Sequence, residues 1–171
     1  TNKEAAFALA PQLKRVFSKL FRTVQLADYL DFKKDFRISL MAHSLGNEIV
    51  KALFNYYEGK EFNQTYFDEM ILAAPDLDDN LFEEDQLFDQ LHKVAERVHV
   101  YFSRKDLTLN MSKAINEKNR LGVSGPSQNS IIQDNILFID VSDVKDERNL
   151  RDMITGHSYY RISELATSDM R

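Results

Sequence analysis

The sequence predicts an α/β fold, in which a mainly parallel sheet is flanked by helices. Four short apolar runs have the composition of buried strands, and segments with apolar residues at helical spacing lie between them. Strands that alternate with helices in this way indicate βαβ units, whose parallel sheet is covered by helices on both faces. Because 171 residues fit one domain, we assign residues 1–171 to a single α/β domain.

The first half of the chain predicts a helix, a strand and a second helix. Apolar residues recur at steps of three and four from Ala6 to Val24, and Pro11 is expected in the first turn because proline fits poorly inside a helix. Residues 37–42 form a short apolar run that is typical of a buried strand. Residues 45–56 again have helical spacing, and Gly59 follows as a stop signal.

The second half continues the alternation of strands and helices. Strands are predicted at residues 70–74, where Pro75 ends the run, and at residues 98–103 and 136–141. Helices are predicted at residues 81–94, 107–118 and 159–165. The clearest loop is residues 122–130, which contain a Gly-Pro pair.

The composition excludes several classes of function. The chain has 22 Lys+Arg against 27 Asp+Glu and a net charge of −5, so it lacks the concentrated basic face that nucleic-acid binding needs. No apolar stretch approaches the roughly 20 residues that cross a bilayer. Without cysteine there is no disulfide, thiolate metal site or cysteine nucleophile. The acidic run at residues 76–80 lacks the glycine of a calcium loop, so we expect no metal site there. We also expect no cofactor. The sequence leaves the location unknown, with the cytoplasm favoured.

The most informative segment is the junction of the first predicted strand and the helix that follows it. Its sequence is Ala42-His43-Ser44-Leu45-Gly46-Asn47, with small residues two before and two after Ser44. A nucleophile elbow needs small residues there because the backbone is too close for large side chains. It also places the serine at a helix N-terminus and turns the next N–H, that of Leu45, toward a developing oxyanion. The alternative is that Ser44 only caps the helix.

A serine nucleophile needs a base, and the chain has four histidines. His43 adjoins the serine but is expected to point away from it along the turn. His92 and His99 fall inside a predicted helix and a predicted strand, where a structural role is expected. His157 follows the last strand in a loop, beside a glycine, and we predict that it is the base.

The serine also needs an acid that orients the base, and two aspartates compete for this role. Asp106 follows the strand at residues 98–103, although an aspartate before a helix can also be a simple N-cap. Asp76 follows the strand at residues 70–74 and is the alternative acid. We prefer Asp106. Ser44, Asp106 and His157 occur in the Ser-acid-His order of α/β-hydrolases.

With these residues in place, the sequence resembles the α/β-hydrolases, and in particular the bacterial family known as domain of unknown function 900. The resemblance is carried by the serine segment and four later blocks: Ala73-Ala74-Pro75-Asp76-Leu77-Asp78 with Phe82, Tyr101-Phe102-Ser103 with Asp106, Arg120-Leu121-Gly122, and Gly156-His157-Ser158-Tyr159-Tyr160. It implies a serine hydrolase of the carboxylesterase or lipase-like kind, with a Ser44-Asp106-His157 triad, an acyl-enzyme and a small ester or lipid-like substrate. A catalytically silent binding scaffold and a serine peptidase are the alternatives.

The sequence departs from the family pattern in two places. Ala42 stands where the usual motif has glycine. The second oxyanion N–H normally comes from a loop upstream of the nucleophile strand, yet residues 1–36 contain no glycine and one predicted helix. We therefore expect the N-terminal strands of the fold to be missing from this chain. The strand at residues 37–42 would then form a sheet edge, which upstream residues or a second copy would cover.

Overall fold

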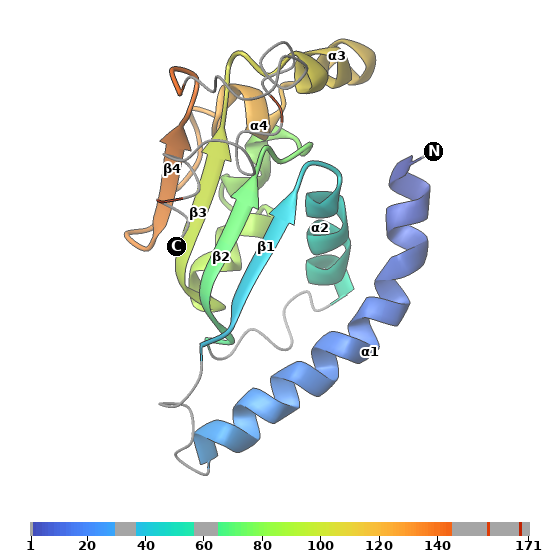
Figure 1. Cartoon of the computed structure of the whole chain (residues 1–171), viewed down its shortest axis with the longest axis vertical. Coiled ribbons are helices and arrows are strands. Elements are labelled where there is room, and N and C mark those ends of the chain that lie inside the picture. Colours follow the sequence, from blue (N-terminus) through green and yellow to red (C-terminus); the bar gives the residue numbers. More distant parts are fainter. Residues whose placement is uncertain (1, 30–36, 57–64, 145–156, 158–167, 169–171) are drawn as a thin grey trace.

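Four parallel strands form the centre of the computed structural model, which describes residues 2–29, 37–56, 65–144, 157 and 168 (Figure 1). The strands are β1 (Ser39–His43), β2 (Phe67–Ala73), β3 (Ala95–Phe102) and β4 (Ile136–Asp140), and they pair in the order β1-β2-β3-β4. The predicted α/β fold with a parallel sheet is confirmed, and each strand lies within a few residues of its expected position. Parallel pairing brings the carboxyl ends of all four strands to one end of the sheet, where their arrowheads lie in Figure 1.

Both faces of the sheet are packed in the described part of the chain, as the sequence predicted, but the cover is uneven. On one face Ile71 and Tyr101 form a buried cluster with Leu109 and Val123, which follow β3. The core contains Ala42, Leu72 and Val100 from one row across the strands, packed with residues of α1 (Asn2–Tyr29) and α2 (Gly46–Tyr56). In the adjacent row, which faces the other way, the side chains of Met41 and Leu137 are 46% and 54% exposed. The face that carries Met41 and Leu137 is therefore covered at its centre and exposed at these two positions.

The first helix is longer than the sequence predicted. α1 begins at Asn2, so Pro11 lies inside it rather than in its first turn. The alanine-rich residues before Pro11 have high helix propensity, and the helix continues through the proline. α1 runs diagonally outside α2 in Figure 1 and contacts it. The Phe21 ring of α1 stacks on Tyr66 at a centroid distance of 3.9 Å, and Phe17 packs edge to face against Phe67. This helix therefore covers the core at the start of β2.

The segment between β2 and β3 contains two short 3₁₀ helices instead of the α-helix predicted at residues 81–94. They are η2 (Asp79–Phe82) and η3 (Leu87–Lys93). The carbonyl of Phe82 accepts a hydrogen bond from Ile131 N–H, and Glu83 forms a β-bridge with Ser130. In an α-helix these backbone groups would be paired internally, so the contact with residues 130–131 replaces the regular helix.

The helices after β3 lie over the carboxyl ends of the strands. α3 (Leu107–Asn116) matches the prediction, whereas α4 (Leu121–Ser124) falls partly in the segment predicted as a loop and ends at Gly125, whose φ is 72°. The helix predicted at residues 159–165 lies outside the described residues. Within the described part, no helix combines the length and the apolar character needed to cross a bilayer.

Candidate active site

Ser44 occupies a strained turn between β1 and α2. Its φ is 52°, in the left-handed region that residues other than glycine adopt infrequently. The Ser44 N–H donates to the Ala73 carbonyl at 3.0 Å, which extends the pairing of β1 with β2 by one residue. The buried Asn47 amide donates to the carbonyls of Ser44 at 3.0 Å and Ala73 at 3.3 Å. Hydrogen bonds with residues of β2 and α2 therefore hold the backbone of this turn, and with it Ser44, in one conformation.

Only one of the two small residues around Ser44 lies in a crowded position. Ala42 is 7% exposed and belongs to the core. A Cβ added to Gly46 would meet no described atom within 4 Å, apart from its chain neighbours and the backbone of its own helix. The expectation that the backbone is crowded at Gly46 is therefore wrong, and this side of the turn is open.

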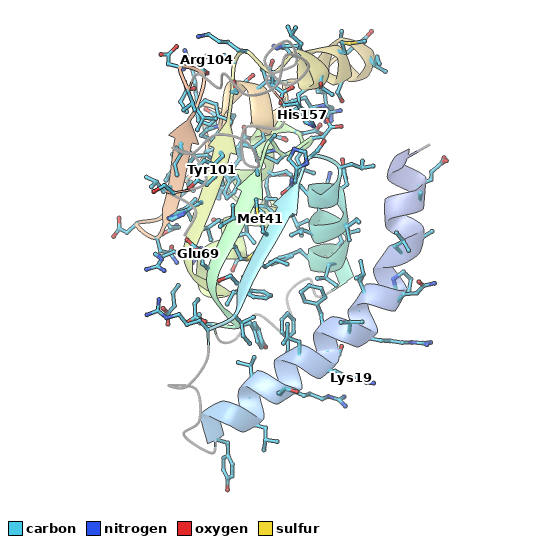
Figure 2. All side chains as sticks on the ribbon, in the orientation of Figure 1. Lys19, Met41, Glu69, Tyr101, Arg104 and His157 are labelled. Carbon is cyan, nitrogen blue, oxygen red and sulfur yellow. The ribbon has the colours of Figure 1, made fainter. Side chains whose placement is uncertain are left out.

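The Ser44 hydroxyl lies within hydrogen-bonding distance of His157. The distance from Ser44 Oγ to His157 Nε2 is 2.9 Å, although the two residues are 113 positions apart. His157 lies at the carboxyl ends of the strands, above β1 in the view of Figure 2. When Nε2 carries no proton it accepts the hydrogen bond from the hydroxyl, which is the arrangement in which an imidazole can remove that proton.

Asp106 serves both as the cap of α3 and as the partner of His157. Its Oδ1 accepts a hydrogen bond from Leu109 N–H at 2.9 Å, and its Oδ2 lies 2.6 Å from His157 Nδ1. The sequence left open whether Asp106 caps the helix or contacts the histidine. In the structure one carboxylate oxygen makes each contact. Since a carboxylate only accepts, the short contact places a proton on Nδ1 of His157 and leaves Nε2 to face Ser44. Asp106 is completely buried, so water does not screen this contact.

Asp76, the alternative acid, is engaged elsewhere. Its Oδ1 accepts a hydrogen bond from Ser112 Oγ at 2.8 Å and lies 3.3 Å from Nε of the buried Arg120, a charge contact without hydrogen-bond geometry. Arg120 Nη1 donates to Asp78 Oδ1 at 2.6 Å. The Asp76 N–H donates a hydrogen bond to the Ser44 carbonyl at 3.4 Å, so this contact with the serine is through the backbone. Its carboxylate therefore neutralises Arg120, and the carboxylate next to His157 belongs to Asp106.

Leu45 lies between Ser44 and the first residue of α2, as the predicted oxyanion donor should. Within the described ranges, no hydrogen bond uses the Leu45 N–H, so this donor is available at the helix N-terminus. Its role in binding an oxyanion stays a prediction. In the same part of the chain, no three His, Asp or Glu side chains are grouped to hold a metal ion.

His43 is the site residue that the sequence analysis missed. It was expected to point away from the site, but its ring lies 4.7 Å from the His157 ring, and its Nε2 is 3.2 Å from the His157 carbonyl oxygen. The available signal was strand alternation: His43 follows the core residue Ala42 and therefore faces the opposite side of the sheet.

Gly122 joins the turns that follow β2 and β3, and the second of these turns leads to Asp106. Its N–H donates to the Pro75 carbonyl after β2, and its carbonyl accepts from Ser103 N–H after β3, both at 2.9 Å. A Cβ at this position would lie 2.7 Å from the carbonyl carbon of Ala74 and 2.5 Å from a methyl of Leu109. These contacts are too short for any side chain, and one of them is to backbone that cannot rotate away.

Replacing Gly122 by alanine is expected to lower the free energy of unfolding by about 1 to 3 kcal/mol, because the turns after β2 and β3 must separate. Gly46→Ala is the matched control, since the same methyl enters open space at the start of α2 and is expected to be neutral or slightly stabilising. Urea unfolding of both variants measures the difference. Equal stabilities would contradict the close packing at Gly122.

Comparison with known proteins gives one finding. A family model described as an alpha/beta hydrolase of unknown function (DUF900) matches residues 3–167. Comparisons with curated proteins and with solved structures give no match. The matched range includes Ser44, Asp106 and His157, the three residues that lie together at the carboxyl ends of the strands.

Proposed function

The chain belongs to the DUF900 family of α/β hydrolases of unknown function, and we propose that it is a serine hydrolase that cleaves carboxylic esters. The observation that carries the proposal is the continuous hydrogen-bonded series from Ser44 Oγ to His157 Nε2, and from His157 Nδ1 to Asp106 Oδ2. A nucleophile within reach of a base, which a third group orients, is the arrangement expected for nucleophilic catalysis. Ser44, His157 and Asp106 are the proposed nucleophile, base and acid.

The proposed reaction proceeds through an acyl-enzyme. Ser44 Oγ attacks the ester carbonyl carbon while His157 Nε2 takes the hydroxyl proton, and the resulting imidazolium is stabilised by the buried Asp106 carboxylate. The Leu45 N–H binds the oxyanion of the tetrahedral intermediate. When the carbon–oxygen bond of the ester breaks, His157 gives its proton to the leaving alcohol. Water, deprotonated by His157, then attacks the acyl carbon. The bond between this carbon and Ser44 Oγ breaks, His157 returns its proton to Oγ, and the carboxylic acid is released.

Two alternatives share parts of this site. A serine peptidase would use the same three groups, and the substrate class distinguishes it from the small-molecule or lipid-like ester that we propose. A silent binding scaffold would have no need of a base held to the serine. The 2.6 Å contact of His157 with Asp106 favours chemistry over the scaffold, because it fixes the tautomer that a base requires.

A fluorophosphonate probe tests the proposal on the full-length protein. The probe phosphonylates activated serines, so we expect one adduct, located on the Ser44 peptide by mass spectrometry. Ser44→Ala should abolish labelling, and Ser124→Ala should leave it unchanged because Ser124 is an exposed residue of α4. An unlabelled wild type, or labelling that persists in Ser44→Ala, would overturn the proposal and favour the scaffold.

A further inference from the structure

The geometry points to His43 as a positioning residue that holds the main chain of His157 through a hydrogen bond to its carbonyl. This inference rests on the proposed function and extends it. The distance from His43 Nε2 to the His157 carbonyl oxygen is 3.2 Å, across 114 positions of sequence. Because a carbonyl oxygen only accepts, His43 must carry a proton on Nε2.

The contact is favourable in packing as well as in hydrogen bonding. The two imidazole rings lie 4.7 Å apart with an angle of 51° between their planes, so they meet as tilted neighbours. Both side chains are partly shielded from water. His43 ends β1, whose pairing with β2 runs from Ser39 to His43, and the donor is therefore mounted on a rigid element.

The described contacts of His157 explain why its main chain needs an anchor. The ring is held at its two nitrogens, by Asp106 and by Ser44. These bonds hold the two nitrogens of the ring and do not by themselves fix the position of the main chain. The hydrogen bond from His43 is the one main-chain contact of His157 among the described residues.

His43 also connects the base to the strand that presents the nucleophile. Ser44 follows His43 directly, so one strand end positions both the serine and the backbone of its base. A displacement of about 1 Å between reacting groups can lower a rate about a hundredfold. A positioning residue of this kind acts on the chemical step and leaves substrate binding largely unchanged.

Two substitutions separate the hydrogen bond from the shape of the ring. His43→Phe keeps a planar ring but has no donor, and we expect kcat for a p-nitrophenyl ester to fall about tenfold with KM nearly unchanged, equivalent to about 1.4 kcal/mol. His43→Gln places an amide N–H near the position of Nε2 and should restore most of the activity. His99→Gln is the matched control, since His99 lies on β3 and pairs with Glu69 away from the site.

Nitrogen NMR of the wild type, labelled in its histidine rings, gives a test that needs no variant to fold. We expect neutral His43 in the Nε2–H form. A neutral His43 in the Nδ1–H form, equal activity of the Phe variant and the wild type, or a Gln variant as impaired as the Phe variant would each overturn the role of His43. A wild type inert to fluorophosphonate would overturn the proposed function instead, and the tautomer measurement would still test the contact itself.

Discussion

Replacing Asp106 by asparagine should lower kcat for an ester substrate by about 10³ to 10⁴-fold while the fold is retained. The side chain of asparagine can still cap α3, because its carbonyl oxygen can accept from Leu109 N–H as Oδ1 does now. Its amide would then face His157 Nδ1. Two N–H donors cannot pair, so the imidazole adopts the other tautomer, and its Nε2 carries a proton that prevents it from accepting the proton of Ser44.

Asp76→Asn is the control for this prediction. Asp76 contacts Ser112 and Arg120, so its neutralisation should lower stability but leave most of the ester turnover. Steady-state kinetics and thermal unfolding of both variants measure the two effects separately. A larger loss of kcat in the Asp76 variant than in the Asp106 variant would reverse the assignment of the acid.

The choice between these two aspartates shows how far sequence reasoning reaches in this protein. Both follow strands whose apolar composition made them predictable, so both were expected at the carboxyl edge of the sheet. The order of residues in the chain is compatible with both, because each aspartate lies between Ser44 and His157. The two carboxylates differ in the side chains that they contact. Asp76 contacts Arg120, which is 44 positions away in sequence. The residues around Asp76 in the sequence give no indication of this contact.

The errors of the sequence analysis also have tertiary causes. Local apolar spacing at residues 81–94 favoured an α-helix, but pairing of Phe82 and Glu83 with residues 130–131 competes for the same backbone groups. Alternating strands and helices predicted a parallel sheet correctly, yet they do not specify strand order, which is sequential here. The expected edge position of β1 agrees with this order. The contact of His43 with His157 depends on where a distant loop returns, which spacing alone does not reveal.

Arg120→Met should lower the free energy of unfolding by about 3 to 5 kcal/mol, the largest stability effect that we expect. Arg120 is completely buried, and its guanidinium lies against Asp76 and Asp78. Methionine fills a similar volume but leaves the two carboxylates without their shared cation. For a chain of this size the loss corresponds to a decrease of Tm on the order of 10 °C. Lys118→Met is the matched control, because Lys118 pairs with the same Asp78 from an exposed position and should contribute about 0 to 1 kcal/mol.

The pH dependence of stability tests whether the effect of Arg120 is electrostatic. Burial alone would raise the pKa of the Asp78 carboxyl, but the hydrogen bond from Lys118 and the charges of Arg120, Lys118 and Lys51 outweigh it and hold that pKa below its ordinary value. A carboxyl with a lowered pKa in the folded state stabilises the fold above its unfolded pKa of about 3.9, and this contribution is lost as the pH falls through the folded value. The difference between wild type and Arg120→Met, measured by urea unfolding, should therefore narrow below about pH 4. A difference that is constant from neutral pH to this range would instead assign the loss to packing around the arginine stem.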